Sequence, residues 1–373
     1  MPGHYSGAGF FMYNLVSALC QIDRPFLLKV FCKPTHASLF QTILQPGDQV
    51  VAVPIRNRAH LLAYYEVGLP RALRREKVRL FHATHYLTPP VHSSYKLITT
   101  VHDMGFFLYP DKYPLIKRAY FRQRFATFLK RADRIWTVSH STRQAVAAFF
   151  PEYHTKLVTI YPGVNHLNDV EPDASIPVPQ PYFLSVNSIE KRKNIPFLIQ
   201  LFNRVKASHL KNARLVIVGY PANGFGEVRR AVQESPFRKD IFFYSNVQPS
   251  FLKTLYARAL CFLSASEYEG FGFTPFEAVW MGVPAFLYRN NTVAELLGDH
   301  PYHFPHYQID RWMDVWHRAY RQQFPERLSP RQIRHLSWEV TAHKAVQLYL
   351  QVMDEGVGLQ PPHRKWEQRV RVM

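Results

Sequence analysis

Cysteine is scarce in this chain, and long apolar runs are missing. Three cysteines, Cys20, Cys32 and Cys261, occur among 373 residues, and each lies in an apolar context without paired spacing. Disulfides or a cysteine-based zinc site are therefore not expected, and a reducing compartment fits. No apolar run reaches the roughly 18 residues of a transmembrane helix, and the N-terminus lacks the layout of a signal peptide. We expect a cytoplasmic protein, soluble or held peripherally on the inner face of the cytoplasmic membrane.

Acidic residues are also few. There are 27 Asp and Glu against 46 Lys and Arg, which gives a formal net charge of +19. Such a charge attracts nucleic acid, acidic lipid headgroups or nucleotide-linked substrates. No Asp-x-Asp triplet and no metal-binding spacing of His, Asp or Glu occurs, so neither a metal nor a cofactor is expected. No nucleic-acid-binding module can be recognised, so nucleic acid is not an expected partner.

The chain does contain a strand, a glycine loop and a helix in close succession. The apolar run Ala259–Leu263 has the length of a buried strand, and a helix is predicted to start at Thr274 and to end at Gly282. Thr274 as N-cap, Pro275 as first helical residue and Glu277 three positions after the cap form a predicted capping box. In a parallel sheet, this order aims a helix N-terminus at a ligand, and an anion suits that position.

Two carboxylates, Glu269 and Glu277, frame this loop with seven residues between them. The capping box alone could explain Glu277, whereas Glu269 lies before the helix and satisfies no cap. The segment Glu269-Gly270-Phe271-Gly272-Phe273-Thr274-Pro275-Phe276-Glu277 resembles the signature of the family 4 retaining glycosyltransferases, which have the GT-B fold. The resemblance implies that Glu269 contacts sugar hydroxyls and Glu277 ribose hydroxyls. It also implies that the loop from Phe271 through Gly272 and Phe273 to Thr274 offers N–H groups to the donor.

The N-terminal residues include Gly7 and Gly9, which are predicted to form a loop just before a helix. Such a loop can hold a phosphate on its backbone N–H groups. In the family that the chain resembles, a Gly-x-Gly turn at this place faces the donor diphosphate, so Gly9 is a candidate donor-binding residue. A first strand precedes that turn in the family but is missing here. We expect either a truncated or mis-assigned start, or a first sheet without one internal strand.

Apolar runs alternate with helical patterns along most of the chain, which predicts parallel crossover units and an α/β fold. The predicted strands are Phe26–Phe31, Val50–Pro54, Leu80–His82, Leu97–Val101, Ile135–Val138, Leu157–Ile160, Tyr182–Val186, Leu215–Gly219 and Ile241–Tyr244, in addition to the run before the glycine loop. A proline-rich linker is expected from His166 to Pro181. A long helix is expected to start after Ser337.

His102 follows the predicted strand Leu97–Val101, at the end where ligands bind in such sheets. A single histidine is usually structural, and this chain has 18. Val-His-Asp at this place matches the family pattern in which the histidine reaches the transferred sugar. Val138-Ser139-His140-Ser141 also resembles a family turn, which by itself is an ordinary helix cap.

Arg192 and Lys193 follow the predicted strand Tyr182–Val186, just before another helix N-terminus. Basic residues at a surface turn are usually solvated. In family 4 enzymes, however, an Arg-Lys-Asn turn at this point holds the donor phosphates. Many members carry a further arginine where this chain has Ser188, so phosphate binding is expected either to be weaker or to rely on Arg192.

The segment Tyr113–Arg134 interleaves basic and aromatic residues, and a second basic cluster lies at Arg71–Arg79. A helix of this kind can lie on an anionic membrane surface. The alternative is an ordinary amphipathic helix that packs its rings on the sheet and leaves its arginines in water. Single-stranded nucleic acid would also suit the interleaving, although less well.

Together these patterns predict a GT-B protein of two Rossmann-like domains that face each other across a cleft. We expect an N-terminal domain at residues 1–170, a nucleotide-sugar-binding domain at 171–340, and a crossing helix with a basic tail at 341–373. The expected activity is metal-independent transfer, with retention, of a mannose-like hexosyl unit from a nucleotide sugar to a glycan or lipid-linked acceptor, in cell-surface polysaccharide or lipopolysaccharide assembly. The alternatives are a catalytically silent binding protein, a GT-B nucleotide-sugar epimerase and a phosphorylase.

Overall fold

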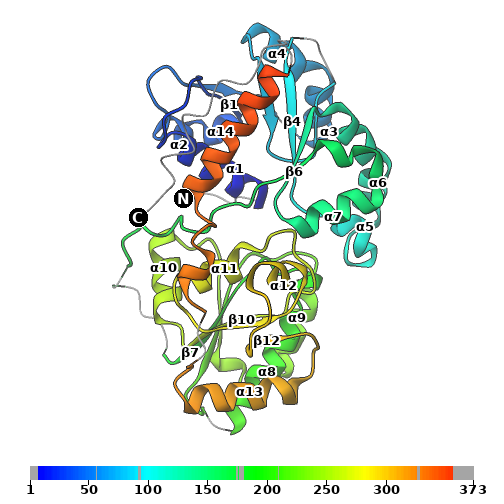
Figure 1. The fold of residues 1–373 in the computed structure, drawn as a ribbon. Coiled ribbons are helices and arrows are strands. Elements are labelled where there is room, and N and C mark those ends of the chain that lie inside the picture. The colour runs from blue at the N-terminus through cyan, green and yellow to red at the C-terminus, as the bar shows by residue number, and fades with distance from the viewer. Residues whose placement is uncertain are drawn as a thin grey trace.

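Two α/β domains form the molecule, and the last long helix runs from one to the other (Figure 1). The structure, a computed structural model, describes residues 7–55, 57–90, 94–173, 175, 180–208, 210–325 and 328–355. The expected basic tail beyond residue 355 and part of the proline-rich linker lie outside these ranges.

The second domain is built on one six-stranded sheet in the order β12-β11-β10-β7-β8-β9, with every neighbouring pair parallel. Its strands are β7 (Tyr182–Val186), β8 (Arg214–Val218), β9 (Ile241–Tyr244), β10 (Cys261–Ser264), β11 (Ala285–Tyr288) and β12 (His303–Phe304). Its helices are α8 (Ile195–Ser208), α9 (Phe225–Glu234), α10 (Pro249–Arg258), α11 (Phe273–Trp280), α12 (Asn291–Leu297) and α13 (Ile309–Arg321). The central strands are apolar along their length because helices cover both faces.

The first domain carries two separate parallel sheets, one of strands β1 and β2 and one in the order β3-β4-β5-β6. The strands are β1 (Lys29–Cys32), β2 (Gln49–Ala52), β3 (Leu80–Ala83), β4 (Lys96–Val101), β5 (Arg134–Thr137) and β6 (Leu157–Thr159). The rings of Phe31 on β1 and Phe81 on β3 meet edge to face, with centroids 6.1 Å apart. Side-chain packing therefore joins the two sheets at this point.

The helices of the first domain are α1 (Gly7–Leu19), α2 (Ala37–Gln41), α3 (Arg58–Ala63), α4 (Leu69–Arg75), α5 (Gly105–Leu108), α6 (Leu115–Arg131) and α7 (His140–Phe149). The prediction of a glycine loop at Gly7 and Gly9 is wrong, since both glycines lie inside α1. The helix is held by the burial of Phe11, Leu15 and Leu19 in the core, and it extends back through both glycines.

Helix α14 (Trp338–Asp354) crosses back from the second domain and packs along α1, as the sequence predicts (Figure 1). Ser337 caps it by accepting a hydrogen bond from the N–H of Val340. Where the chain first leaves the first domain, the N–H of Val164 donates to the carbonyl of Leu336 over 2.9 Å. The two segments that connect the domains thus run side by side and are hydrogen-bonded to each other. No helix in the described part of the chain is long and apolar enough to cross a membrane.

Candidate active site

The glycine loop lies between β10 and α11, at the carboxyl end of the second sheet. The predicted capping box is wrong: α11 begins at Phe273, its N-cap is Gly272, and no side chain caps it. Gly272 has φ of +85°, a left-handed conformation that turns the chain into the helix before Thr274 is reached. Thr274 is therefore a first-turn residue, and Glu277 is free to point inward.

Glu277 is turned into the protein, where it is only 4% exposed. Its carboxylate accepts a hydrogen bond of 2.8 Å from the hydroxyl of Tyr256, and it lies 3.7 Å from Nε2 of His166. Burial raises the pKa of Glu277 to about 7 and lowers the pKa of His166 to about 4. Near neutral pH, His166 is uncharged and Glu277 is close to half protonated, so among the described residues no charged side chain pairs with this buried carboxyl group.

Glu269 has the opposite environment, although it is also buried, at 6% exposure. One carboxylate oxygen accepts hydrogen bonds from Lys193 and from the hydroxyl of Ser266, and the other accepts one of 2.8 Å from Arg192. Burial alone would raise the pKa of Glu269, but Lys193 and Arg192 lower it to about 2. Glu269 is therefore a carboxylate at all physiological pH values.

The two cations come from the turn after β7, as the sequence predicts. Arg192 also bonds to Glu190 over 2.8 Å and to the carbonyl of Tyr268 over 2.7 Å. Lys193 is buried, and burial lowers its pKa despite the contact with Glu269. Two cations thus face two carboxylates, and the cluster is neutral as a whole. A bound diphosphate would have to share these cations with Glu269 and Glu190.

His102 reaches this loop from the first domain, just after β4. Its Nε2 lies 2.7 Å from the carbonyl of Thr84, and since a carbonyl only accepts, Nε2 carries the proton. Burial lowers the pKa of His102, so the ring is neutral and Nδ1 offers a lone pair. The backbone contact to the glycine loop is close: a Cβ on Gly270 would lie 1.6 Å from the His102 carbonyl oxygen. Only glycine fits there.

Several residues that hold the loop were not assigned to the site from the sequence. The carbonyl of Gly270 accepts hydrogen bonds from the hydroxyls of Ser139, over 2.5 Å, and Thr142, over 3.1 Å. Ser139 is also the N-cap of α7, which confirms the predicted cap. The side-chain amide of Asn291 makes two hydrogen bonds to the backbone of Glu269: it accepts one from the N–H and donates one to the carbonyl. These contacts join distant segments, so no local spacing could have shown them.

Aromatic side chains close the site on the α1 side. Gly9 lies within α1, and its neighbour Phe10 packs edge to face on His166 and on Phe273, with centroid distances of 4.7 and 5.0 Å. Phe271 is buried and packs against Phe276. Both glutamates are thus almost fully covered by side chains of the protein.

Glu295 on α12 bonds the second domain to the first. Its two oxygens accept hydrogen bonds from the N–H groups of His140 and Ser141, over 2.8 and 2.7 Å, and from the hydroxyl of Tyr161, over 2.6 Å. The carboxylate therefore caps α7 from the other domain, where the helix dipole favours a negative charge.

We predict that Glu295→Ala lowers the free energy of unfolding by about 2 kcal/mol, because a charged cap and its three partners are lost together. Urea denaturation followed by intrinsic fluorescence measures this loss. Glu339→Ala, at an exposed glutamate in the first turn of α14, is the control and should lower the free energy of unfolding by about 0.5 kcal/mol at most. A Glu295→Ala midpoint equal to that of the wild type would contradict the interdomain cap.

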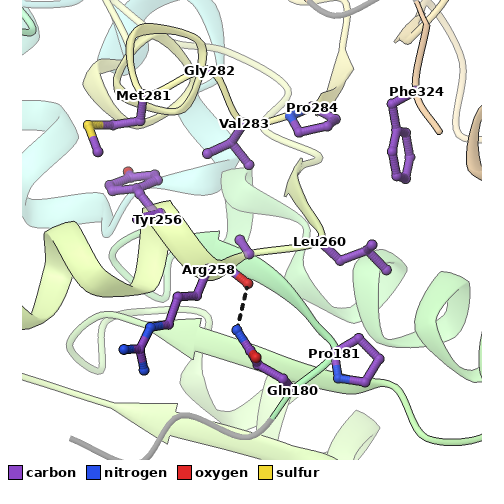
Figure 2. Close-up of a pocket in the computed structure, with 12 residues that line it drawn as sticks. Gln180, Pro181, Tyr256, Arg258, Leu260, Met281, Gly282, Val283, Pro284 and Phe324 are labelled. Atoms are coloured by element: carbon purple, nitrogen blue, oxygen red, sulfur yellow. Dashed lines mark hydrogen bonds between the residues drawn. The ribbon is translucent and has the colours of Figure 1, made fainter. Parts of the chain in front are cut away.

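A hollow of about 570 Å³ lies elsewhere in the second domain (Figure 2). Pro181, Leu260 and Pro284, which line it, immediately precede β7, β10 and β11. The hollow is therefore at the amino ends of these strands, opposite the edge where ligands bind in such sheets. Within the described ranges, no group of three or more His, Cys, Asp or Glu side chains is placed to hold a metal ion.

Known proteins resemble this chain along most of its length. A family model described as Glycosyltransferase Family 4 matches residues 5–166, and one described as Glycosyl transferases group 1 matches residues 169–332. The O-antigen chain mannosyltransferase RfbU of Salmonella typhimurium is 25% identical over 293 residues, 76% of this chain and 78% of that protein. O-antigen chain mannosyltransferase B of Escherichia coli is 27% identical over 259 residues, 66% of this chain and 67% of that protein.

Solved structures share the fold at lower identity. Sucrose-phosphate synthase from Thermosynechococcus elongatus superposes with a TM-score of 0.73 at 18% identity, covering 94% of both chains. The Anabaena protein HepE in complex with UDP and glucose gives a TM-score of 0.68 at 13% identity, covering 94% of this chain and 98% of that one. The predicted GT-B fold is thereby confirmed, and with the two family matches it shows that the chain belongs to the family 4, group 1 retaining glycosyltransferases.

Proposed function

We propose that this protein transfers a mannose-like hexosyl unit from a nucleotide sugar to a hydroxyl of a glycan or lipid-linked acceptor, with retention of the anomeric configuration. The observation that carries the proposal is the meeting of His102 from one domain with the loop that contains Glu269 in the other. The named O-antigen mannosyltransferases support the sugar and a role in lipopolysaccharide assembly. We place the reaction in the cytoplasm.

In this proposal, the donor's diphosphate lies at Arg192, Lys193 and the N-terminus of α11, with N–H groups of Phe271, Gly272, Phe273 and Thr274 nearby. Fixed cations and a helix N-terminus can stabilise charge that develops on a leaving diphosphate, so the protein need not supply a metal. Glu277 accepts hydrogen bonds from the ribose hydroxyls and Glu269 from the sugar. Gly9, now placed inside α1, borders the donor only through the backbone of that helix.

His102 contributes from the other side of the cleft. Its unprotonated Nδ1 would accept a hydrogen bond from a hydroxyl of the transferred sugar and so orient the anomeric carbon. Glu269 is a poor nucleophile because two cations neutralise it. We therefore propose that no protein nucleophile takes part, and that the proton of the acceptor hydroxyl passes to the departing diphosphate.

The test is a thermal-shift panel of nucleotide sugars, followed by an assay of nucleoside diphosphate release with and without a lipid-linked glycan acceptor. Transfer predicts release that depends on the acceptor. An epimerase would convert the donor without an acceptor, and a phosphorylase would require inorganic phosphate. A silent binding protein would show a thermal shift without turnover, and any of these three results would overturn the proposal.

A further inference from the structure

Two segments from different domains pack against each other at the candidate active site. One is 102–104, which follows β4 in the first domain, and the other is 268–270, which lies between β10 and α11 in the second. A Cβ on Gly270 would lie 1.6 Å from the carbonyl oxygen of His102. The N–H of Met104 donates a buried hydrogen bond of 2.9 Å to the hydroxyl of Tyr268. The later residue of one segment is thus paired with the earlier residue of the other, so the segments pass each other in opposite directions.

Tyr268 is fixed at both its backbone and its side chain. It is 5% exposed, and its ring packs against that of Tyr109 from the first domain, with centroids 5.2 Å apart. Its carbonyl accepts a hydrogen bond of 2.7 Å from Arg192. Burial and the nearby carboxylate of Asp103 raise the pKa of Tyr268, so its hydroxyl stays neutral. The residue therefore joins the backbone of the first domain to a cation of the second.

The place of this contact in the chain gives it a further consequence. Tyr268 immediately precedes Glu269, and Met104 comes two residues after His102. The hydroxyls of Ser139 and Thr142 also hold the glycine loop, but they come from α7. In the part of the chain that the structure describes, the hydrogen bond to Tyr268 is the one that joins the two segments directly.

We infer that Tyr268 is a positioning residue for the proposed transfer, because its hydrogen bond to Met104 sets where His102 stands relative to Glu269. The inference rests on the proposed function, since it concerns the reaction at the same site. Tyr268 acts through His102 and not by contact with the donor. A misplacement of about 1 Å can cost about 100-fold in rate, so loss of the hydrogen bond should lower kcat.

The experiment compares the wild type with Tyr268→Phe, which keeps the ring and removes the acceptor of the Met104 N–H. A transfer assay gives kcat and the KM for the donor, and calorimetry gives the affinity for nucleoside diphosphate. We expect kcat to fall by between about tenfold and 100-fold. The KM and the nucleotide affinity should stay within about threefold of the wild type, because the backbone carbonyl that binds Arg192 is unchanged.

Tyr182→Phe is the matched control for a purely structural effect. The hydroxyl of Tyr182 is also buried and also bonds to the backbone, donating to the carbonyl of Leu255 over 2.6 Å. Tyr182 begins β7, so it lies at the edge of the sheet opposite the candidate site. This variant should lower the thermal midpoint, as Tyr268→Phe does, but it should keep the wild-type kcat. Circular dichroism establishes that both variants are folded.

A double variant distinguishes positioning from an independent contribution to the rate. If Tyr268 acts through His102, its hydroxyl has no effect on the rate once the imidazole is gone. His102→Ala/Tyr268→Phe should therefore transfer sugar within about threefold of the rate of His102→Ala alone. Two independent effects would instead multiply.

Four results would overturn the inference and leave the transferase activity standing. They are a wild-type kcat in Tyr268→Phe, an equal loss of kcat in Tyr182→Phe, a loss of nucleotide affinity in Tyr268→Phe as large as its loss of kcat, and multiplied losses in the double variant. A wild-type protein that transfers no sugar would overturn the proposed function and this inference together.

Discussion

Replacing His102 by alanine is expected to reduce hexosyl transfer by at least about 100-fold, while nucleoside diphosphate still binds within a few fold of wild-type affinity. The reason lies in where each group sits. His102 belongs to the first domain, whereas the residues proposed to hold the nucleotide, Arg192, Lys193 and Glu277, belong to the second. Loss of Nδ1 therefore removes an orienting contact to the sugar and leaves the nucleotide contacts in place.

Calorimetry with the bare nucleoside diphosphate and a transfer assay measure the two effects separately. His154→Ala, at an exposed histidine just before β6, at the opposite end of the first domain's sheet from His102, is the control and should change neither. If a folded His102→Ala protein no longer bound the nucleotide, the donor would have to lie on the first domain, and the assignment of the site would be wrong.

Replacing Glu277 by glutamine should make the free protein more stable at neutral and alkaline pH. The pKa of this carboxyl group is raised from 4.5 to about 7 in the fold, so its ionisation opposes folding. The protonated carboxyl group therefore makes its full contribution to the free energy of unfolding below pH 4.5, and this contribution is lost as the pH rises through about 7. Above that pH, the glutamine variant should exceed the wild type by about 3 kcal/mol, and below pH 4.5 the two should agree.

At about pH 8 and above, where Glu277 is mainly a carboxylate, the same variant should bind nucleoside diphosphate about tenfold more weakly, because a hydrogen bond to a charged acceptor is stronger than one to an amide. Urea titrations between pH 4 and 9 and calorimetry measure the two effects. Glu339→Gln, at an exposed position, should reproduce the wild-type pH profile. If Glu277→Gln changed neither the pH dependence of stability nor the affinity for nucleoside diphosphate, Glu277 would not have the proposed role.

Local patterns were sufficient for several elements. Strands β7 and β9 occupy the predicted ranges Tyr182–Val186 and Ile241–Tyr244, and α14 begins after Ser337 as expected. Strand β10 begins at Cys261, two residues after the start of the apolar run, because Ala259 is still the C-cap of α10. Strand β12 has two residues, which is too short for an apolar pattern to predict it from the sequence.

Local patterns failed where tertiary contacts decide. The Thr274 to Glu277 spacing has the form of a capping box, yet Tyr256 on α10 draws Glu277 inward and Gly272 starts the helix. The basic and aromatic residues of α6 left two readings open, a helix on a membrane surface or a helix that packs its rings on the domain, and only the fold decides for the second. In each case the sequence shows which side chains are able to interact strongly, but it does not show which part of the protein they contact.

The candidate site was partly predictable for the same reason. Residues at the ends of strands, such as His102, Lys193 and Glu269, could be placed at the sheet edges from strand order alone. Other contacts of the site connect segments more than 70 residues apart. Lys193 and Arg192 neutralise Glu269, and the hydroxyl of Ser139 donates a hydrogen bond to the carbonyl of Gly270. Only the folded chain shows them.

A structure of the protein with the nucleoside diphosphate of its preferred donor would test most directly whether the donor binds between the two domains. We predict diphosphate oxygens within hydrogen-bond distance of Arg192, Lys193 and the first N–H groups of α11, and ribose hydroxyls at Glu277. We also predict that the sugar side of the diphosphate faces His102. Nucleotide bound at the amino ends of the strands, in the hollow lined by Pro181 and Pro284, or bound to the first domain alone, would contradict the proposed site.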